Sequence, residues 1–196
     1  MSKIIPSKNG SKKQVITGKA TRLFKEKGFP ATSMRHIAEA MGIEAPSLYN
    51  HIRSKGEILS DICFTVAKEF MHHIKIVEQG EEPVINKMEM IIRFHIKMMI
   101  EKYESVYVSD HEWKHLKEPE LTEFKILRRN YRKRFAEIAQ EGIKNKELKS
   151  IDAYVMILTI FSAIGGIENW QRSKKNIDAA ILEENMVSVL IDGIRR

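Results

Sequence analysis

The chain has 196 residues, of which 43% are hydrophobic and 30% charged, with a formal net charge of +7 and a single cysteine, Cys63. These values exclude a chain that is disordered throughout and an intrachain disulfide, and the lone cysteine fits a reducing cytoplasm. Only ten glycines and five prolines are present, which favours long helices over a turn-rich β fold.

Residues 1–11 are polar and basic and contain a proline and a glycine, so we expect a flexible arm there, either a solvated tail or one that reaches DNA. A helix is predicted from about residue 12 to residue 27, because apolar side chains recur on one face of it, namely Ile16, Ala20, Leu23 and Phe24. Gly28 is expected to end this helix, and Phe29 to pack beneath the segment that follows.

Residues 33–55 have the pattern of two short helices separated by a tight turn. The first helix carries an apolar stripe at helical spacing, formed by Met34, Ile37, Ala38 and Met41. Ser33 stands where its hydroxyl can cap the first turn, and Gly42 can end the helix by adopting the left-handed conformation.

The second helix of the pair begins near Pro46, which suits a first helical turn because its missing N–H would have no intrahelical partner there. Leu48 and Ile52 are predicted to point inward one turn apart. A polar outer face is left, formed by Ser47, Tyr49, Asn50 and His51. A helix, a turn and a second helix with a polar outer face form the helix-turn-helix that enters a DNA major groove.

The distribution of charge favours DNA as the partner of this segment. Residues 1–55 contain eleven Lys or Arg and three acids, a balance of +8, whereas the remaining residues hold 22 basic and 23 acidic side chains. Positive charge gathered on one third of the chain is expected of a surface that meets phosphates. An anionic membrane would also attract such a surface, but the discrete helix-turn-helix makes DNA the better interpretation.

This part of the chain resembles the N-terminal domain of the TetR family of transcriptional regulators. The resemblance rests on four pairs of residues: Gly28-Phe29 after the first predicted helix, Ile37-Ala38 in the second, Leu48-Tyr49 in the third and Ser54-Lys55 at the opening of the fourth. The sequence departs from the family pattern at Glu44, where a Ser or Thr cap is usual, and at Ile52, where Phe is usual. The resemblance implies an all-α fold, with a three-helix DNA-binding domain over residues 1–55 and a helical ligand-binding and dimerisation domain over residues 56–196.

The resemblance also implies a set of DNA contacts. Tyr49 and His51 would touch phosphates, and Lys55 would do so from the N-terminal end of the fourth helix. The residues nearest the groove would be Ser33, Arg35, Ala45, Pro46, Ser47 and Asn50, of which Asn50 can pair bidentately with adenine.

The rest of the chain is predicted to be helical, over residues 55–77, 84–101, 120–145, 153–170 and 178–194, with a less regular stretch at 103–119 and a clear break at 79–83. Within residues 84–101, one face is expected to carry Met88, Ile91, Ile92, His95 and Met99. Residues 153–170 are apolar nearly all round, which indicates a helix buried on more than one side. The last two helices have more apolar surface than one small domain can cover, which predicts a four-helix interface with a second copy of the chain.

The longest apolar run, over residues 153–167, is shorter than the roughly 20 residues that cross a bilayer, and residues 1–13 lack the apolar core of a signal peptide. We therefore expect a cytoplasmic protein without a membrane partner.

Residues 111–115 read His-Glu-Trp-Lys-His, the pattern in which two histidines one helical turn apart bind zinc while the glutamate activates water. The flanking residues leave room for barely two helical turns, and the third ligand would have to be an acid such as Glu137 or Glu141. We expect a histidine pair that lines or caps a pocket, with a zinc-dependent enzyme as the alternative. Because no nucleotide-binding glycine loop and no Ser-His-Asp order is recognised, we predict no cofactor and no enzymatic activity.

Methionine and aromatic residues gather on the helices that surround an inducer pocket in TetR-like proteins. Such residues are usually core, yet ten methionines give a surface that adapts to flexible apolar ligands. The predicted pocket consists of Met88, Phe94, Met98, Trp113, Phe124, Leu127, Arg128, Tyr131, Phe161 and Trp170. The pattern around Leu127, Tyr131 and Gly142 resembles family members that regulate fatty-acid and lipid catabolism, which implies an acyl-CoA whose phosphates lie near Arg128, Arg129, Arg132 or Lys133.

The sequence therefore predicts a TetR-type regulator, most simply a repressor that binds a palindromic operator as a homodimer. A hydrophobic small molecule, with a fatty acyl-CoA as the first candidate, would release it. A sensor of drugs or other hydrophobic ligands is the alternative within the family, and an architectural protein without a small ligand is an alternative outside it.

Overall fold

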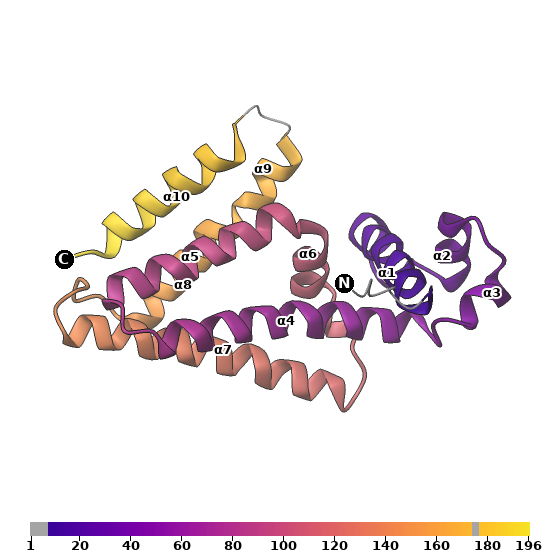
Figure 1. Cartoon of the computed structure of the whole chain (residues 1–196), viewed down its shortest axis with the longest axis horizontal. Helices are drawn as coiled ribbons and strands as arrows, with labels where there is room; N and C mark the ends of the chain where they lie inside the picture. The colour runs from indigo at the N-terminus through magenta and orange to yellow at the C-terminus, as the bar shows by residue number, and fades with distance from the viewer. Residues whose placement is uncertain (1–7, 174–176) are drawn as a thin grey trace, which may run out of the picture. The chain divides into compact units, whose positions relative to one another are not determined.

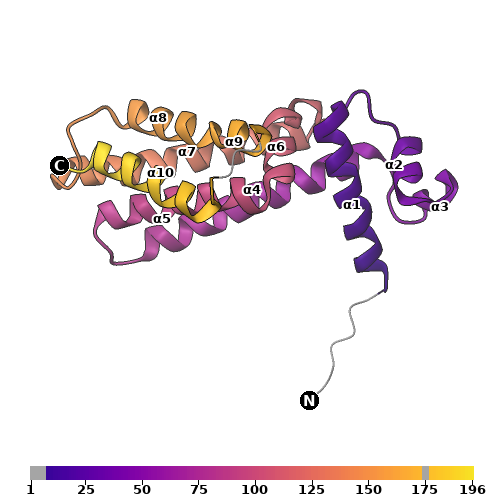
Figure 2. The same cartoon turned by 90° about the horizontal axis from the view of Figure 1, so that it is seen from above.

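The computed structural model describes residues 8–173 and 177–196, which are helical apart from turns and an isolated β-bridge between Leu148 and Arg195 (Figures 1 and 2). In chain order the helices are α1 (Lys8–Lys27), α2 (Met34–Met41), α3 (Ala45–Tyr49), α4 (Lys55–Gln79), α5 (Val84–Glu101), α6 (Tyr103–His111), the 3-10 helix η1 (Trp113–His115), α7 (Glu120–Lys144), α8 (Ala153–Gly165), α9 (Ile167–Ser173) and α10 (Ala179–Ile194). The predicted all-α class is confirmed.

The chain packs as two compact units, and each is described by itself. Unit 1 comprises Met1–Val66 and Glu104–Phe124, and unit 2 comprises Ala67–Tyr103 and Lys125–Arg196. This division differs from the predicted boundary after residue 55, because α4 begins in unit 1 and ends in unit 2, and because most of α6 packs with the N-terminal helices. The assignment of DNA binding to residues 1–55 and of ligand binding to residues 56–196 stays a prediction.

The core of unit 1 joins α1, α2 and α3. Its side chains are at most 2% exposed and include Ile16, Ala20, Phe24, Ile37, Ala38, Leu48 and Ile52, all of which were predicted to face inward. Leu23, Met34 and Met41 are only half-buried, and α3 ends at Tyr49, so Ile52 packs in the core from beyond the helix. The predicted inner face is therefore wrong at these three residues; Met34 and Met41 lie at the two ends of α2, where fewer side chains cover them.

Helix α1 begins at Lys8, four residues before its predicted start, so residues 8–11 of the predicted arm are helical. A single glycine costs a helix only about 1 kcal/mol, and Gly10 therefore does not prevent the early start. Residues 1–7 of the predicted arm lie outside the described residues.

Unit 2 is built around α5, whose predicted apolar face is buried at Met88, Ile91, Ile92, His95 and Met99. Helices α8, α9 and α10 pack against α5, and Figure 1 shows α10 beside it. Gln171 of α9 closes the end of α5, because its Nε2 donates to the carbonyl oxygens of Met99 and Ile100 at 3.1 and 3.3 Å.

The predicted helix over residues 153–170 is divided in the structure. Gly166 lies in a turn between α8 and α9, and only part of the surface of α8 is buried, in contrast to the prediction. Together the two helices, Ala153–Ser173, reach the length and hydropathy of a membrane span, with 33% of the apolar window buried in the protein. The length of this apolar segment therefore does not exclude a membrane-spanning helix, in contrast to the prediction. In the structure one face of α8 packs against α5 and α10.

Candidate nucleic-acid interface

Helix α2 begins with a reciprocal cap. The Ser33 hydroxyl accepts a hydrogen bond from the backbone N–H of His36 at 3.1 Å, and Nδ1 of His36 accepts from the backbone N–H of Ser33 at 3.2 Å. A glutamate usually supplies the second bond of such a capping box, and here an imidazole does so. The predicted role of Ser33 as a cap is confirmed, and the bond to Nδ1 requires that this nitrogen carry no proton.

The turn between α2 and α3 is closed by Gly42, whose φ of 67° and ψ of 32° are left-handed. Its N–H donates to the carbonyl oxygen of Glu39, and the N–H of Ile43 donates to that of Ala38. Pro46 lies in the first turn of α3, as predicted, and Glu44 precedes the helix without a side-chain cap. The two helices of the predicted motif are thus joined by the expected turn.

The side chains predicted to contact DNA are mostly exposed on this motif. Arg35, Pro46, Ser47 and Asn50 are exposed, Tyr49 is 54% exposed, and Ala45 and His51 are half-buried. Asn50 ends α3 as its C-cap. Polar side chains that stand out from a helix-turn-helix are available to phosphates and base edges.

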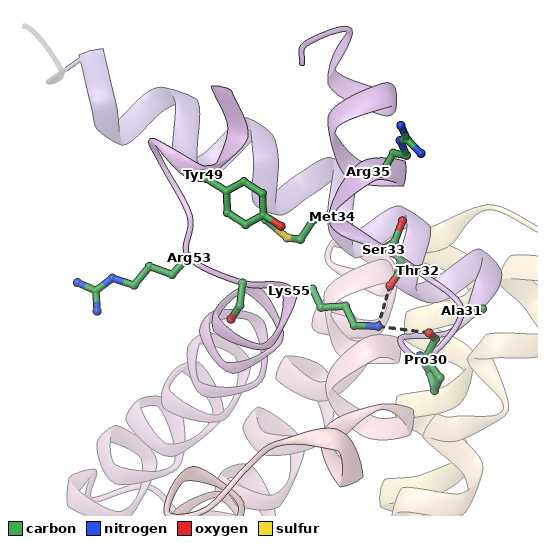
Figure 3. A pocket seen from close by; sticks show the side chains of 10 residues that line it. Pro30, Ala31, Thr32, Ser33, Met34, Arg35, Tyr49, Arg53 and Lys55 are labelled. Carbon is green, nitrogen blue, oxygen red and sulfur yellow. Dashed lines mark hydrogen bonds between the residues drawn. The ribbon is translucent and has the colours of Figure 1, made fainter. Parts of the chain in front are cut away.

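A surface hollow of about 500 Å³ lies between the start of α2 and the start of α4 (Figure 3). It is lined by residues 30–35 and by Tyr49, Arg53, Ser54 and Lys55. Ser54 caps α4, because its hydroxyl accepts from the N–H of Glu57 at 3.1 Å. The exposed Arg53 was missed by the sequence analysis, although its position next to Ser54-Lys55 in a basic segment was a signal for it.

Lys55 has contacts that the sequence did not indicate. Its Nζ donates to the carbonyl oxygens of Phe29, Pro30 and Thr32 at 2.8, 3.3 and 2.7 Å, and it lies 4.4 Å from the centre of the Phe29 ring. Two of these bonds are drawn in Figure 3. The ammonium group of Lys55 is therefore directed at the loop between α1 and α2.

The His-Glu-Trp-Lys-His segment does not form a zinc-peptidase site. Helix α6 ends at His111 and η1 begins at Trp113, so the two histidines do not share one helix face. Oε2 of Glu112 accepts from the N–H of Phe29 at 3.3 Å and lies 3.5 Å from Nε2 of His115. Among the described residues, no group of three His, Cys, Asp or Glu side chains is placed to hold a metal ion.

The start of α4 is also tied to α1 by charge. Lys13 lies 2.7 Å from Asp61 and 3.3 Å from Glu57. The hydrogen bond to Asp61 raises the pKa of Lys13, and the hydrogen bond from the N–H of Arg53 lowers the pKa of Glu57. These ion pairs join the first turns of α4 to α1.

The predicted pocket residues divide between the two units. Trp113 and Phe124 belong to unit 1, where their rings lie 6.2 Å apart, and the other eight belong to unit 2. Met88, Met98, Phe124 and Tyr131 are buried, and Phe94, Trp113, Leu127, Arg128, Phe161 and Trp170 are half-buried. Whether these residues bind a ligand stays a prediction.

Unit 2 places a polar pair within an aromatic cluster. Nε2 of His95 lies 2.7 Å from the hydroxyl of Tyr131, and the His95 ring packs against Phe70 and Phe161. Burial lowers the pKa of His95 to about 3 and raises the pKa of Tyr131, so both groups are neutral at pH 7. Phe70 was missed by the sequence analysis, and His95 was read only as part of an apolar face, although an ionisable residue on such a face was a signal.

A capped second helix, a left-handed turn and an exposed polar third helix define a helix-turn-helix DNA-binding protein. Residues 16–62 match the family model described as bacterial regulatory proteins of the tetR family, and residues 81–194 match that of the tetracyclin repressor-like C-terminal domain. The chain belongs to the TetR family of transcriptional regulators. It is therefore a regulator and not an enzyme.

Over 190 residues the chain is 25% identical to the HTH-type transcriptional repressor KstR2 of Rhodococcus jostii (strain RHA1), covering 95% of this chain and 92% of that protein. The structure of the ketosteroid transcriptional regulator KstR2 of Mycobacterium tuberculosis is similar with a TM-score of 0.86 at 18% identity, covering 98% and 97% of the two chains. AibR in complex with isovaleryl coenzyme A and operator DNA is similar with a TM-score of 0.79 at 19% identity, covering 91% and 97%. These two structures share their fold with this chain.

Proposed function

We propose that the chain is a transcriptional repressor that acts in the cytoplasm, binds a palindromic operator as a homodimer and leaves it when a hydrophobic small molecule binds. The observation that carries the proposal is the exposed polar face of α2 and α3 beside the hollow at the start of α4. This face lies in the third of the chain that holds the whole excess of positive charge. Similarity to KstR2, which is named a repressor, supports repression over activation.

The proposed contacts sort by chemistry. Tyr49, His51 and Arg53 contact DNA phosphates, because hydroxyl, imidazole and guanidinium groups donate hydrogen bonds to phosphate oxygens. Arg35 and Asn50 contact the edges of bases in the major groove, because Arg can pair bidentately with guanine and Asn with adenine. The small or polar residues Ser33, Ala45, Pro46 and Ser47 line the approach to the groove.

The proposed homodimer rests on apolar side chains that unit 2 leaves exposed. On α8, Tyr154, Val155 and Leu158 are 72%, 50% and 52% exposed, and on α10, Ile181 and Val189 are 56% and 72% exposed. Helices α8 and α10 pack against each other. Exposed apolar side chains on two helices that pack together favour an interface with a second copy, which would set two helix-turn-helices at the spacing of two half-sites.

The dimer is tested by the pair Tyr154→Glu and Val189→Glu, made together. We expect a monomer by sedimentation velocity, with the helical circular dichroism retained and operator affinity lost. The matched control is Ile76→Glu, because Ile76 is 51% exposed on α4 and lies outside the proposed interface. A double variant that remains dimeric would contradict the use of this face.

The proposed effector is a fatty acyl-CoA. Its acyl chain is suited to the methionine and aromatic side chains of unit 2, and its phosphates to the exposed Arg129, Arg132 and Lys133 of α7. The likeness to AibR, whose structure holds isovaleryl coenzyme A, supports this class of ligand. The second candidate is a ketosteroid, which is favoured by similarity to KstR2 along nearly the whole chain.

The function is tested by fluorescence anisotropy with DNA from upstream of the protein's own gene, at fixed salt. Long-chain acyl-CoA, isovaleryl-CoA and a ketosteroid are titrated separately into the complex. We expect tight, sequence-specific binding that an acyl-CoA releases, since an effector acts only through its different affinities for the two states of the protein. Release by the ketosteroid alone would favour the second candidate.

Two other outcomes would count against the proposal. Tight binding that none of the three ligands releases would contradict both proposed effectors and leave the repressor intact. Weak binding that disappears at physiological salt would contradict the operator, because non-specific affinity falls steeply with salt.

A further inference from the structure

We propose that Lys55 and Glu112 are positioning residues for operator binding, which hold the α1–α2 loop (residues 28–33) so that α2 begins at a fixed place. The inference rests on the proposed function, because its readout is affinity for DNA. It assigns Lys55 a different role from the phosphate contact that the family resemblance implies. It also gives Glu112, from a segment remote in sequence, a part in the DNA-binding unit.

The first observation is that Lys55 is saturated with partners inside the protein. An ammonium group has three protons, and three carbonyl oxygens of the loop lie within 3.3 Å of this one. The Phe29 ring is in cation–π range of the same nitrogen. A phosphate at Lys55 would have to replace at least one of these bonds.

The second observation is that Glu112 binds the backbone N–H of Phe29, a loop residue that Lys55 also contacts. The carboxylate accepts from the Phe29 N–H at 3.3 Å, and its side chain is only 15% exposed. The neighbouring His115 ring stacks on the Phe29 ring, with centroids 5.4 Å apart and planes 20° apart. Phe29 is therefore held at its N–H, its carbonyl and its ring by two segments outside the loop.

The loop has little freedom of its own once these contacts form. Gly28 has a φ of 82°, the Thr32 hydroxyl donates to the carbonyl oxygen of Gly28 at 2.9 Å, and the Thr32 side chain is 1% exposed. Residue 33 follows directly as the cap of α2. Fixing the loop therefore fixes the start of the helix that carries Arg35, and a small displacement there would misplace the whole motif.

The proposal is tested with two pairs of variants, using full-length protein and operator DNA. Lys55→Met and Glu112→Ala remove the bonds, whereas Lys55→Arg and Glu112→Gln are the conservative partners. Affinity is measured by anisotropy at several salt concentrations, and amide exchange over residues 29–37 is measured by mass spectrometry without DNA. Lys19→Met, an exposed lysine of α1, controls for the loss of charge alone.

We expect Lys55→Met and Glu112→Ala to bind about tenfold more weakly with an unchanged slope of log K against log salt, and to exchange faster over residues 29–37. Glu112→Gln should bind like the wild type, because its amide oxygen can still accept from Phe29. Lys55→Arg should not restore binding, since a planar guanidinium cannot direct three N–H groups at three converging carbonyls.

The opposite results would overturn the proposal. If Lys55→Arg binds like the wild type and Lys55→Met lowers the salt slope by about 0.9, Lys55 contacts a phosphate directly. Unchanged amide exchange over residues 29–37 in both Lys55→Met and Glu112→Ala would also overturn the proposal. If the wild type binds no DNA, the proposed function fails. Faster amide exchange in Lys55→Met and Glu112→Ala would then still show that these two residues restrain the α1–α2 loop.

Discussion

The two units of this protein keep their residues in place by different means. In unit 1, the α1–α2 loop is held by directional polar bonds from Lys55 and Glu112 to backbone groups. In unit 2, the apolar core contains a cluster of aromatic rings around a buried polar pair, His95 and Tyr131. We infer that polar substitutions in unit 1 mainly change DNA affinity, whereas substitutions in the core of unit 2 mainly change stability.

The largest expected effect on stability is that of Gly142→Ala in unit 2. An added Cβ would lie 2.7 Å from Cγ of Leu148 and 2.8 Å from Cγ1 of Val84, two side chains that are 1% and 3% exposed. Overpacking of this kind costs about 2 kcal/mol. Urea unfolding should show this loss, while Gly18→Ala in α1, where nothing lies within 4 Å, should be neutral or stabilising by up to about 1 kcal/mol.

The second expected effect is a loss of stability in acid that originates in unit 2. His95 takes up a proton near pH 3 when folded and near pH 6.5 when its pKa is unperturbed, so acid favours the unfolded chain between these values. From pH 6.5 to pH 5, this difference lowers the free energy of unfolding by about 1.5 kcal/mol.

The control for the acid effect is the double variant His95→Leu/Tyr131→Phe, which removes both partners and so leaves no unpaired polar group. Urea unfolding at both pH values should show a smaller acid-induced loss in the double variant, by the amount attributed to His95. Equal losses in the two proteins would mean that His95 is not buried in its neutral form.

A smaller effect is expected from Ser33→Ala in unit 1. The loss of the cap on α2 should lower the free energy of unfolding by about 1 kcal/mol. Ser47→Ala, on the exposed face of α3, is the matched control and should leave stability unchanged. If operator affinity falls more in Ser33→Ala than the loss of stability explains, this result would support the inference that polar substitutions in unit 1 mainly change DNA affinity.

The smallest effect is expected for the ion pairs that join α5 to α10. Arg93 makes a bidentate contact with Glu184 at 2.6 and 3.1 Å, which lowers the pKa of Glu184, but the Glu184 side chain is 66% exposed and that of Arg93 is 32% exposed. Arg93→Met should therefore lower Tm by about 2 °C or less. Because salt screens exposed charges, the difference from the wild type should shrink in 1 M NaCl, as measured by thermal circular dichroism.

The sequence by itself determined the elements whose causes are local. Ser33, Gly42 and Pro46 act on backbone groups within four residues, so their places at helix ends could be read from spacing. The apolar face of α5 was equally readable, since the period of an α-helix places its members on one side, and so was the buried centre of the α2 stripe, Ile37 and Ala38. The family assignment follows from the same segments.

Only the tertiary structure decided the partners of polar side chains and the limits of individual helices. Lys55 reaches carbonyls 23 to 26 residues away, and Glu112 reaches an N–H 83 residues away. No local pattern encodes such pairs, because packing, not spacing, brings them together. For the same reason the His-Glu-Trp-Lys-His pattern could not be decided from sequence. A zinc site needs both histidines on one helix, whereas α6 ends at His111 and Glu112 accepts a hydrogen bond from the N–H of Phe29.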